Sequence, residues 1–208
     1  AADALKNAAN KNMITLNLVE TLGEGVKLVG AAEETEQGHA ADDGHDHANE
    51  IDEHVWMSLK NAKLFTSQVA DALGTIDPDF AGAYKANAEG YGAELLELDA
   101  LYSDFTDNPA NKLLIIADRF PFRYLFDDYG LKYRAAFDGC SADFEASFDT
   151  IIGLAKLADE NAQEEIIVTE TSNKKVANAL IENSKMPAHE ILVLASMQSV
   201  SRADIDAG

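Results

Sequence analysis

Residues 77–105 read DPDFAGAYKANAEGYGAELLELDALYSDF, the stretch that decides the architecture of this chain. Asp77 is suited to cap a helix, and Pro78 fits its first position, where a missing N–H costs nothing. At 1.5 Å per residue such a helix would be about 40 Å long, enough to cross a whole domain. Apolar residues recur at helical spacings on one predicted face: Phe80, Tyr84, Tyr91, Leu95, Leu98 and Leu101.

The residues after this helix, which ends at Asn108-Pro109, alternate between short apolar strands and amphipathic helices. This alternation predicts βαβ units, and hence a parallel sheet covered by helices on both faces. Strands are expected at 113–117, 132–137, 164–170 and 190–195, and helices at about 120–129, 143–161 and 172–184. Four aromatic residues are expected to face the core: Phe120, Phe122, Tyr124 and Phe126.

The residues before the long helix are less regular. Residues 1–11 are expected to be helical, and MITLNLVE at 13–20 suits a strand. A second amphipathic helix is predicted to follow DEHVW and to stop at Gly74. Its expected apolar face consists of Leu59, Ala62, Phe65, Val69 and Leu73.

Composition limits the possible functions of the chain. The 208 residues are 47% hydrophobic, which is ordinary for a globular protein. The formal charge of −21 argues against nucleic-acid binding, because phosphate neutralisation needs clustered Lys and Arg. A single cysteine, Cys140, excludes an internal disulfide and any Cys-rich zinc module. No apolar run approaches the ~20 residues of a membrane-spanning helix.

The segment 33–54, EETEQGHAADDGHDHANEIDEH, holds four of the five histidines and neither Lys nor Arg. Imidazole suits zinc, copper and nickel, so the composition favours a metal-attracting loop over a merely solvated acidic one. His39, His45 and His47 are candidate ligands within it. His54, at a helix entrance and beside carboxylates, is well placed as a ligand whose second ring nitrogen is held by a partner.

The string DEHVWMS (52–58) resembles the D-P-H-x-W-x-S motif of the solute-binding proteins of zinc and manganese ABC transporters. The resemblance extends over nearly the whole chain, with order and spacing preserved. It continues through 73–99, FRYLFDDYGLKY (122–133), 144–158, IIVTE (166–170) and LVLASMQS (192–199).

This resemblance implies an α/β fold of two lobes, each a parallel sheet flanked by helices, joined by one long linker helix. Residues 1–76 would then be the remainder of an incomplete N-terminal lobe that carries the loop 33–54. Residues 77–108 would be the linker helix and 109–208 the C-terminal lobe. The family binds its metal between the lobes.

The ligand set implied by the resemblance is three histidines, or two histidines and a glutamate, often joined by an aspartate. His54 matches the histidine of the D-P-H-x-W motif. The next ligand position falls on Arg119, which cannot ligate a metal, and the aspartate expected after the last strand falls on Ala195. Asp118 is a possible substitute, whereas the loop histidines His39, His45 and His47 could complete a set with His54.

The function implied is capture of zinc, in preference to manganese, outside the membrane and delivery to an ABC permease, without catalysis. The protein is expected to be a monomeric periplasmic or cell-surface lipoprotein. One alternative is a divergent zinc-sequestering or chaperone domain, which the residues Arg119 and Ala195 favour. A metallohydrolase is the weakest alternative, since the chain has no H-E-x-x-H or comparable ligand cluster.

Overall fold

The computed structural model describes residues 2–10, 12–29, 51–106, 113–137, 146–186, 188–200 and 202–207. Its helices are α1 (Ala2–Asn7), α2 (Leu18–Leu22), α3 (Leu59–Ile76), α4 (Ala81–Thr106), α5 (Arg123–Asp128), α6 (Phe148–Glu160), α7 (Lys175–Asn183) and α8 (Arg202–Ala207). The 3-10 turns are η1 (Gly23–Gly25), η3 (Val55–Met57) and η4 (Pro78–Phe80). The strands are β1 (Leu114–Ile116), β2 (Tyr133–Ala135), β3 (Glu165–Thr169) and β4 (Glu190–Leu194).

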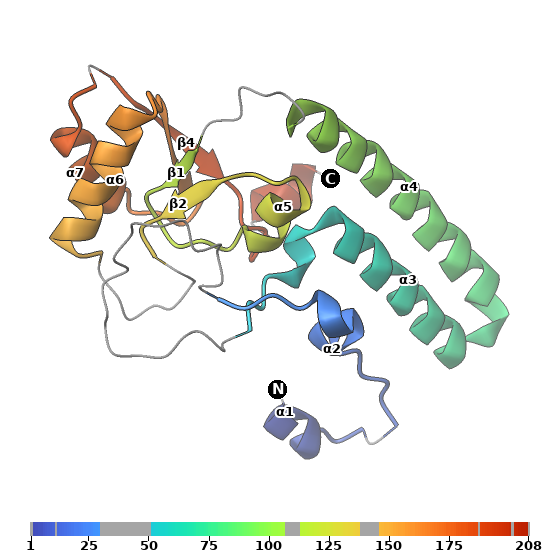
Figure 1. Cartoon of the computed structure of the whole chain (residues 1–208). Coiled ribbons are helices and arrows are strands. Elements are labelled where there is room, and N and C mark those ends of the chain that lie inside the picture. Colours follow the sequence, from blue (N-terminus) through green and yellow to red (C-terminus); the bar gives the residue numbers. More distant parts are fainter. Residues whose placement is uncertain are drawn as a thin grey trace.

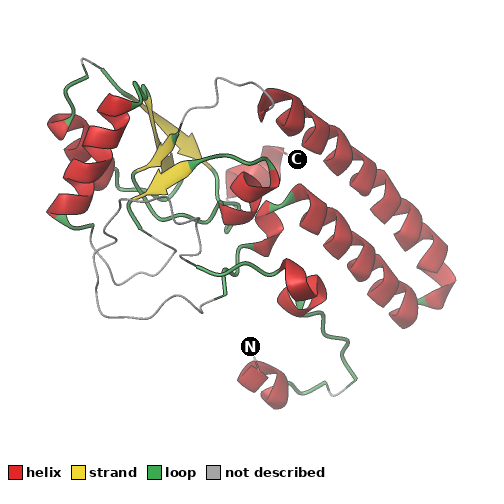
Figure 2. Cartoon of the chain, viewed as in Figure 1, coloured by secondary structure: helices red, strands yellow, loops and turns green. Residues whose placement is uncertain are grey.

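The four strands form one parallel sheet in the order β2-β1-β3-β4 (Figures 1 and 2). Helix α5 connects β1 to β2, α6 connects β2 to β3, and α7 connects β3 to β4. The register pairs Ile115 with Ile166 in the centre of the sheet. The prediction of an α/β fold with a helix-covered parallel sheet and one long helix is therefore confirmed. Among the described residues, no helix is both long and apolar enough to cross a membrane.

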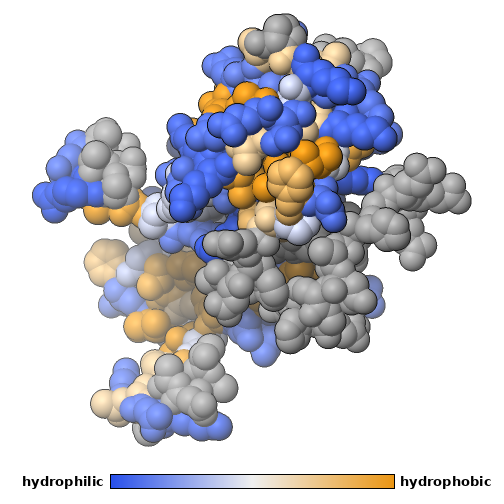
Figure 3. All heavy atoms as spheres, turned by 90° about the vertical axis from the view of Figure 1, so that its left-hand side faces the viewer, coloured by the Kyte–Doolittle hydropathy of each residue, from blue (hydrophilic) through white to orange (hydrophobic). Residues whose placement is uncertain are grey.

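One face of the sheet is covered by α6 and α7, which lie side by side (Figure 1). Helix α6 begins after a capping residue, Ser147, whose hydroxyl accepts a hydrogen bond from the amide of Thr150. We call the buried residues of this face the aliphatic core: Ile115, Ala117, Ala136, Leu154, Ala155, Ala158, Ile166, Val168, Ala177 and Leu180. Seen from this side, the outer surface carries hydrophilic residues around a hydrophobic patch (Figure 3).

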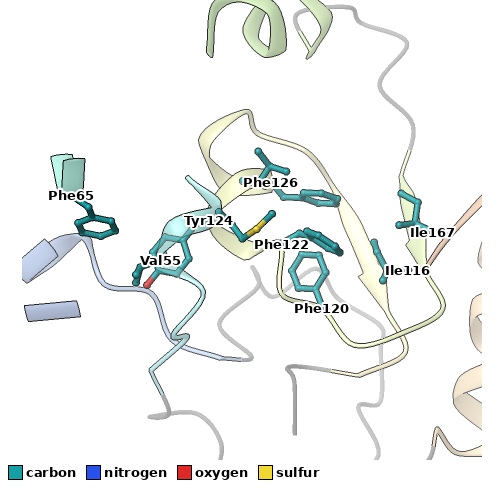
Figure 4. Close-up of a cluster of buried hydrophobic side chains, with 10 residues drawn as sticks. Val55, Phe65, Ile116, Phe120, Phe122, Tyr124, Phe126 and Ile167 are labelled. Atoms are coloured by element: carbon teal, nitrogen blue, oxygen red, sulfur yellow. The ribbon is translucent and has the colours of Figure 1, made fainter. Parts of the chain in front are cut away.

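The other face of the sheet is covered by the segment 120–126 and by η3. Because successive side chains of a strand point to opposite faces, Ile116 and Ile167 face this side while Ile115 and Ile166 face the aliphatic core. Figure 4 shows the aromatic rings between these strand residues and Val55. We call this cluster the aromatic core: Val55, Met57, Phe65, Ile116, Phe120, Phe122, Tyr124, Leu125, Phe126 and Ile167. The predicted inward orientation of the four aromatic residues is confirmed.

Helices α3 and α4 form an antiparallel hairpin that extends away from the sheet (Figure 1). The two helices meet closely at their shared end, where a Cβ added to Gly74 would lie 3.1 Å from the Cβ of Ala81. The prediction that Gly74 ends the helix is wrong, because α3 runs on to Ile76. The glycine allows close approach there and does not stop the helix.

The apolar faces predicted for this hairpin are mostly not buried. Leu95 is buried, but Tyr91 is 52% exposed and Leu101 is 65% exposed. On α3, Phe65 is buried whereas Val69 is 44% exposed. Helical spacing places these residues on a common face, but the described elements cover only part of it.

The strand predicted at 13–20 is also wrong. Residues 13–17 form neither helix nor strand, and α2 begins at Leu18, where the side chain of Asn17 accepts a hydrogen bond from the amide of Glu20. Leu18, Val19 and Leu22 then pack against the aromatic core as one side of a helical turn. A cap and a hydrophobic contact thus override the β-propensity of this stretch.

Candidate metal site

The imidazole of His54 is the centre of the candidate site. The side chain is buried, with 5% of the residue exposed. Its Nδ1 lies 2.7 Å from Oδ1 of Asp52, which also accepts a hydrogen bond from the backbone N–H of His54 at 2.9 Å. A carboxylate in this position favours a proton on Nδ1, which makes Nε2 the nitrogen with the lone pair for a metal. The predicted carboxylate partner of this histidine is therefore Asp52.

The sequence around His54 folds into a short turn that aims alternate residues in different directions. Val55 and Met57, in η3, are buried in the aromatic core. Ser58 then caps α3, since its hydroxyl accepts a hydrogen bond from the amide of Asn61 at 3.1 Å and donates one to Asp128 at 2.6 Å. This turn is fixed on both sides, so the position of His54 is set by the core and by the helix start.

Trp56 links this turn to the far edge of the sheet. Its ring lies edge-on to the ring of His54, with centroids 5.4 Å apart and an interplanar angle of 62°. Its indole N–H donates a hydrogen bond of 3.2 Å to the carbonyl oxygen of Ser196, which follows β4. Trp56, which contacts the candidate ligand His54, is therefore hydrogen-bonded to the C-terminal part of the chain.

The carboxyl ends of the parallel strands carry polar side chains, as is usual for ligand sites of α/β sheets. Oδ2 of Asp118, after β1, accepts hydrogen bonds from the amide and hydroxyl of Thr169 at 3.1 and 2.9 Å. Oδ1 of Asp118 accepts the backbone N–H of Arg119 at 2.8 Å. The carboxylate suggested as a substitute ligand is thus engaged in holding two strand ends together.

Glu170, after β3, holds the end of β4 through Ser196. Its two carboxylate oxygens accept the amide N–H of Ser196 at 2.8 Å and its hydroxyl at 2.7 Å. Partial burial by itself raises the pKa of Glu170, but these two hydrogen bonds and one to its own backbone outweigh that effect, so the pKa lies below its ordinary value. The carboxylate is therefore ionised at neutral pH and is a strong acceptor.

Residues 27–28 and 51–52 meet beside His54, and the tract between them contains His39, His45 and His47. Leu28 and Ile51 form an antiparallel bridge, and the amide of Asp52 donates to the carbonyl of Lys27 at 2.9 Å. The hydroxyl of Tyr124, deep in the aromatic core, accepts the amide of Lys27 at 2.9 Å and donates to the carbonyl of Asp52 at 3.0 Å. The base of the tract is thereby fixed within two residues of the candidate ligand.

The other residues expected at the site have different positions. His39, His45 and His47 lie outside the described residues. Arg119 and Ala195, at positions where the resemblance implies ligands, are both exposed. Within the described ranges, no group of three or more His, Cys, Asp or Glu side chains is arranged to hold a metal ion. The described residues thus provide one oriented imidazole and its supports.

Sequence reasoning missed three residues that support His54: Tyr124, Glu170 and Ser196. The signal for Tyr124 was available, because a buried tyrosine hydroxyl requires a hydrogen-bond partner. No comparable signal exists for Ser196, which is 140 positions away from Trp56 in the sequence. His189 contacts the hydroxyl of Ser184 through Nε2 at 2.7 Å.

Comparison with known proteins places the chain in a family. The sequence profile described as "ZnuA: Zinc-uptake complex component A periplasmic" matches residues 2–206. The "Zinc-binding protein AdcA" of Streptococcus pyogenes serotype M1 is 28% identical over 191 residues, covering 92% of this chain and 36% of that protein. The "High-affinity zinc uptake system protein ZnuA" of Bacillus subtilis is 32% identical over 190 residues, covering 89% of this chain and 56% of that protein.

Solved structures resemble the fold described above. A Zn(II)-bound variant of AdcAII from Streptococcus pneumoniae superposes with a TM-score of 0.69 at 20% identity, covering 90% of this chain and 62% of that one. At this identity the likeness concerns the fold alone. The chain spans about a third to a little over half of the length of the two curated relatives that it matches.

Proposed function

The chain belongs to the ZnuA family of periplasmic zinc-uptake components, and from that membership we propose that it captures zinc outside the cytoplasmic membrane and delivers it to an ABC permease. The observation that carries the proposal is the buried imidazole of His54, oriented by the carboxylate of Asp52. A histidine whose second nitrogen is held by a carboxylate is the usual form of a zinc ligand in proteins. Residues 1–76, 77–108 and 109–208 would form, respectively, part of a first lobe, a linker helix and a second lobe.

Zinc is favoured over manganese because of the donor atoms that the chain offers. Imidazole nitrogen suits zinc, whereas manganese prefers carboxylate and carbonyl oxygen. His39, His45 and His47, which precede His54 in the same segment of the sequence, would supply further nitrogens. Capture and delivery involve no bond making or breaking in a substrate, and a monomer located in the periplasm or on the cell surface would suffice.

A second candidate function is zinc sequestration or chaperoning by the histidine tract alone. The observation in its favour is that Arg119 and Ala195 occupy implied ligand positions, while the described residues contain no cluster of three metal-binding side chains. In that case His54 would be dispensable for zinc binding, and the tract would bind the ion by itself.

Isothermal titration calorimetry with zinc chloride and manganese chloride distinguishes these functions. We expect tighter binding of zinc than of manganese, and a loss of zinc affinity of roughly tenfold or more in His54→Ala. His189→Gln is the matched control, since it removes a histidine that contacts Ser184 and lies apart from the site. Unchanged zinc affinity in His54→Ala, together with its loss in the double variant His45→Ala/His47→Ala, would establish sequestration instead.

The affinity for zinc should also depend on pH. Neutral imidazole binds the metal and protonated imidazole does not, so the affinity should fall as the pH drops through about 6.5, the ordinary pKa of histidine. No zinc binding by the intact chain at pH 7.5 would contradict both candidate functions.

A further inference from the structure

A continuous set of contacts connects the carboxylate of Glu170 to the ring of His54. Ser196 is buried, with 4% of the residue exposed, and it is the central residue of this set. Its amide and hydroxyl both donate to Glu170, at 2.8 and 2.7 Å, and its carbonyl oxygen accepts the indole N–H of Trp56 at 3.2 Å. Each polar group of Ser196 is thereby used, so the residue has little freedom to move independently of Glu170.

Trp56 transmits this fixed position to the candidate ligand. Its ring contacts the ring of His54 edge-on at 5.4 Å, while Asp52 holds Nδ1 of the imidazole at 2.7 Å. The imidazole is thus held by Asp52 from its own segment and by Trp56 from the sheet. An aromatic ring that is only in van der Waals contact could rotate, whereas a hydrogen-bonded indole has a defined plane.

We propose that Glu170 is a positioning residue for zinc binding, acting through Ser196 and Trp56 on the orientation of His54. The proposal rests on the proposed function, in which His54 ligates the ion. It assigns a role to a carboxylate that lies after β3. The role is to keep the end of β4, and the indole bound to it, in the place that the imidazole requires.

The experiment is a comparison of Glu170→Gln with Glu164→Gln. Glu170→Gln replaces one of the two accepting oxygens with an NH₂ group, so the present arrangement, in which each oxygen accepts one hydrogen bond from Ser196, cannot form. Glu164 is exposed and lies at the opposite end of the same strand, so its substitution removes the same charge from a place remote from Ser196. Zinc affinity is measured by calorimetry with zinc chloride, and the folded state by thermal unfolding.

We expect Glu170→Gln to weaken zinc binding by roughly tenfold, the loss typical of a removed support for a metal ligand. Trp56 is the single tryptophan of the chain, so its emission reports the same change in the absence of metal. The emission should shift in Glu170→Gln and stay unchanged in Glu164→Gln. A purely structural role for Glu170 would lower the unfolding temperature and leave zinc affinity and emission of the folded protein as in the wild type.

Wild-type zinc affinity in folded Glu170→Gln would overturn the positioning role, as would an equal loss in Glu164→Gln. Should Glu170→Gln fail to fold, Ser196→Ala removes one of the two hydrogen bonds and should weaken zinc binding by a factor of about 3, a part of the loss expected for the whole support. Wild-type affinity in that variant would overturn the role equally.

The variant His54→Ala tests the proposed site separately. Unchanged zinc affinity in His54→Ala contradicts the proposed site itself, whereas a loss in His54→Ala together with wild-type affinity in Glu170→Gln contradicts only the positioning role.

Discussion

The sheet and the α3–α4 hairpin both contain regularly spaced apolar residues, but the burial of these residues differs. In the sheet, Ile115, Ile166 and Val168 are fully buried, since they lie in the aliphatic core beneath α6 and α7. In the hairpin, Leu101 is 65% and Phe105 77% exposed, although both fall on the apolar side of α4. The spacing of apolar residues in the sequence therefore defines an apolar face, whereas the burial of that face requires another element packed against it. Substitutions should therefore have large effects in the first region and small ones in the second.

The largest effect is expected for Phe122→Ala. Phe122 is fully buried and stacks on Phe126 with ring centroids 6.1 Å apart. Its truncation should lower the free energy of unfolding by about 3–5 kcal/mol, measured by urea denaturation. The matched control is Phe105→Ala in the hairpin, which should change it by less than about 0.5 kcal/mol. Similar losses in the two variants would contradict the contrast between the regions.

A smaller loss is expected for Tyr124→Phe. The substitution keeps the ring and removes the hydroxyl that bonds the amide of Lys27 and the carbonyl of Asp52. Unpaired buried polar groups cost about 1–3 kcal/mol, so the free energy of unfolding should fall by that amount. Tyr91→Phe on α4, where the ring is 52% exposed, is the control and should have almost no effect. An unaffected Tyr124→Phe would show that water replaces the lost hydroxyl.

A gain in stability is expected for Gly90→Ala in α4. A Cβ at this position meets no atom within 4 Å, so the substitution should stabilise the helix by about 0.5–1 kcal/mol through helix propensity. Gly74→Ala is the comparison, because its Cβ would lie 3.1 Å from Ala81 and the crowding offsets the gain. Thermal unfolding of the two variants measures the difference, and an equal gain in both would mean that the hairpin end is loosely packed.

The smallest effect concerns acid stability at the edge of the sheet region. The Ser184 hydroxyl and the amides of Lys185 and Met186 donate to Asp159 and lower its pKa, although partial burial acts in the opposite direction. As the pH falls, Asp159 is therefore protonated in the unfolded chain before it is protonated in the folded protein. The stability that its carboxylate contributes at neutral pH is lost as the pH falls below about 4. Asp159→Asn should show a smaller loss of stability between pH 6 and pH 3 than the wild type, measured by urea denaturation. An identical loss would exclude Asp159 as a contributor, and Glu164→Gln controls for the removed charge.

The sequence predicted the sheet region closely because its signals are local. The strand expected at 190–195 is observed as Glu190–Leu194, and the helix expected at about 172–184 as Lys175–Asn183. The apolar stretch 13–20 misled for the opposite reason: a strand needs a neighbouring strand, and Asn17 instead caps a short helix there. At the site, His54 and its carboxylate partner Asp52 were accessible to sequence reasoning because they are two residues apart.

The sequence by itself determined the long helix, the order of strands and helices, and the family motif around His54. Each of these depends on residues within a few positions of one another, so their signals are present in short stretches. Only the tertiary structure decided which apolar faces are buried and what holds the candidate imidazole. Trp56 meets Ser196 across 140 positions and Tyr124 meets Asp52 across 72, and no local pattern encodes such pairs. Both contacts form only when the folded chain brings these distant residues together.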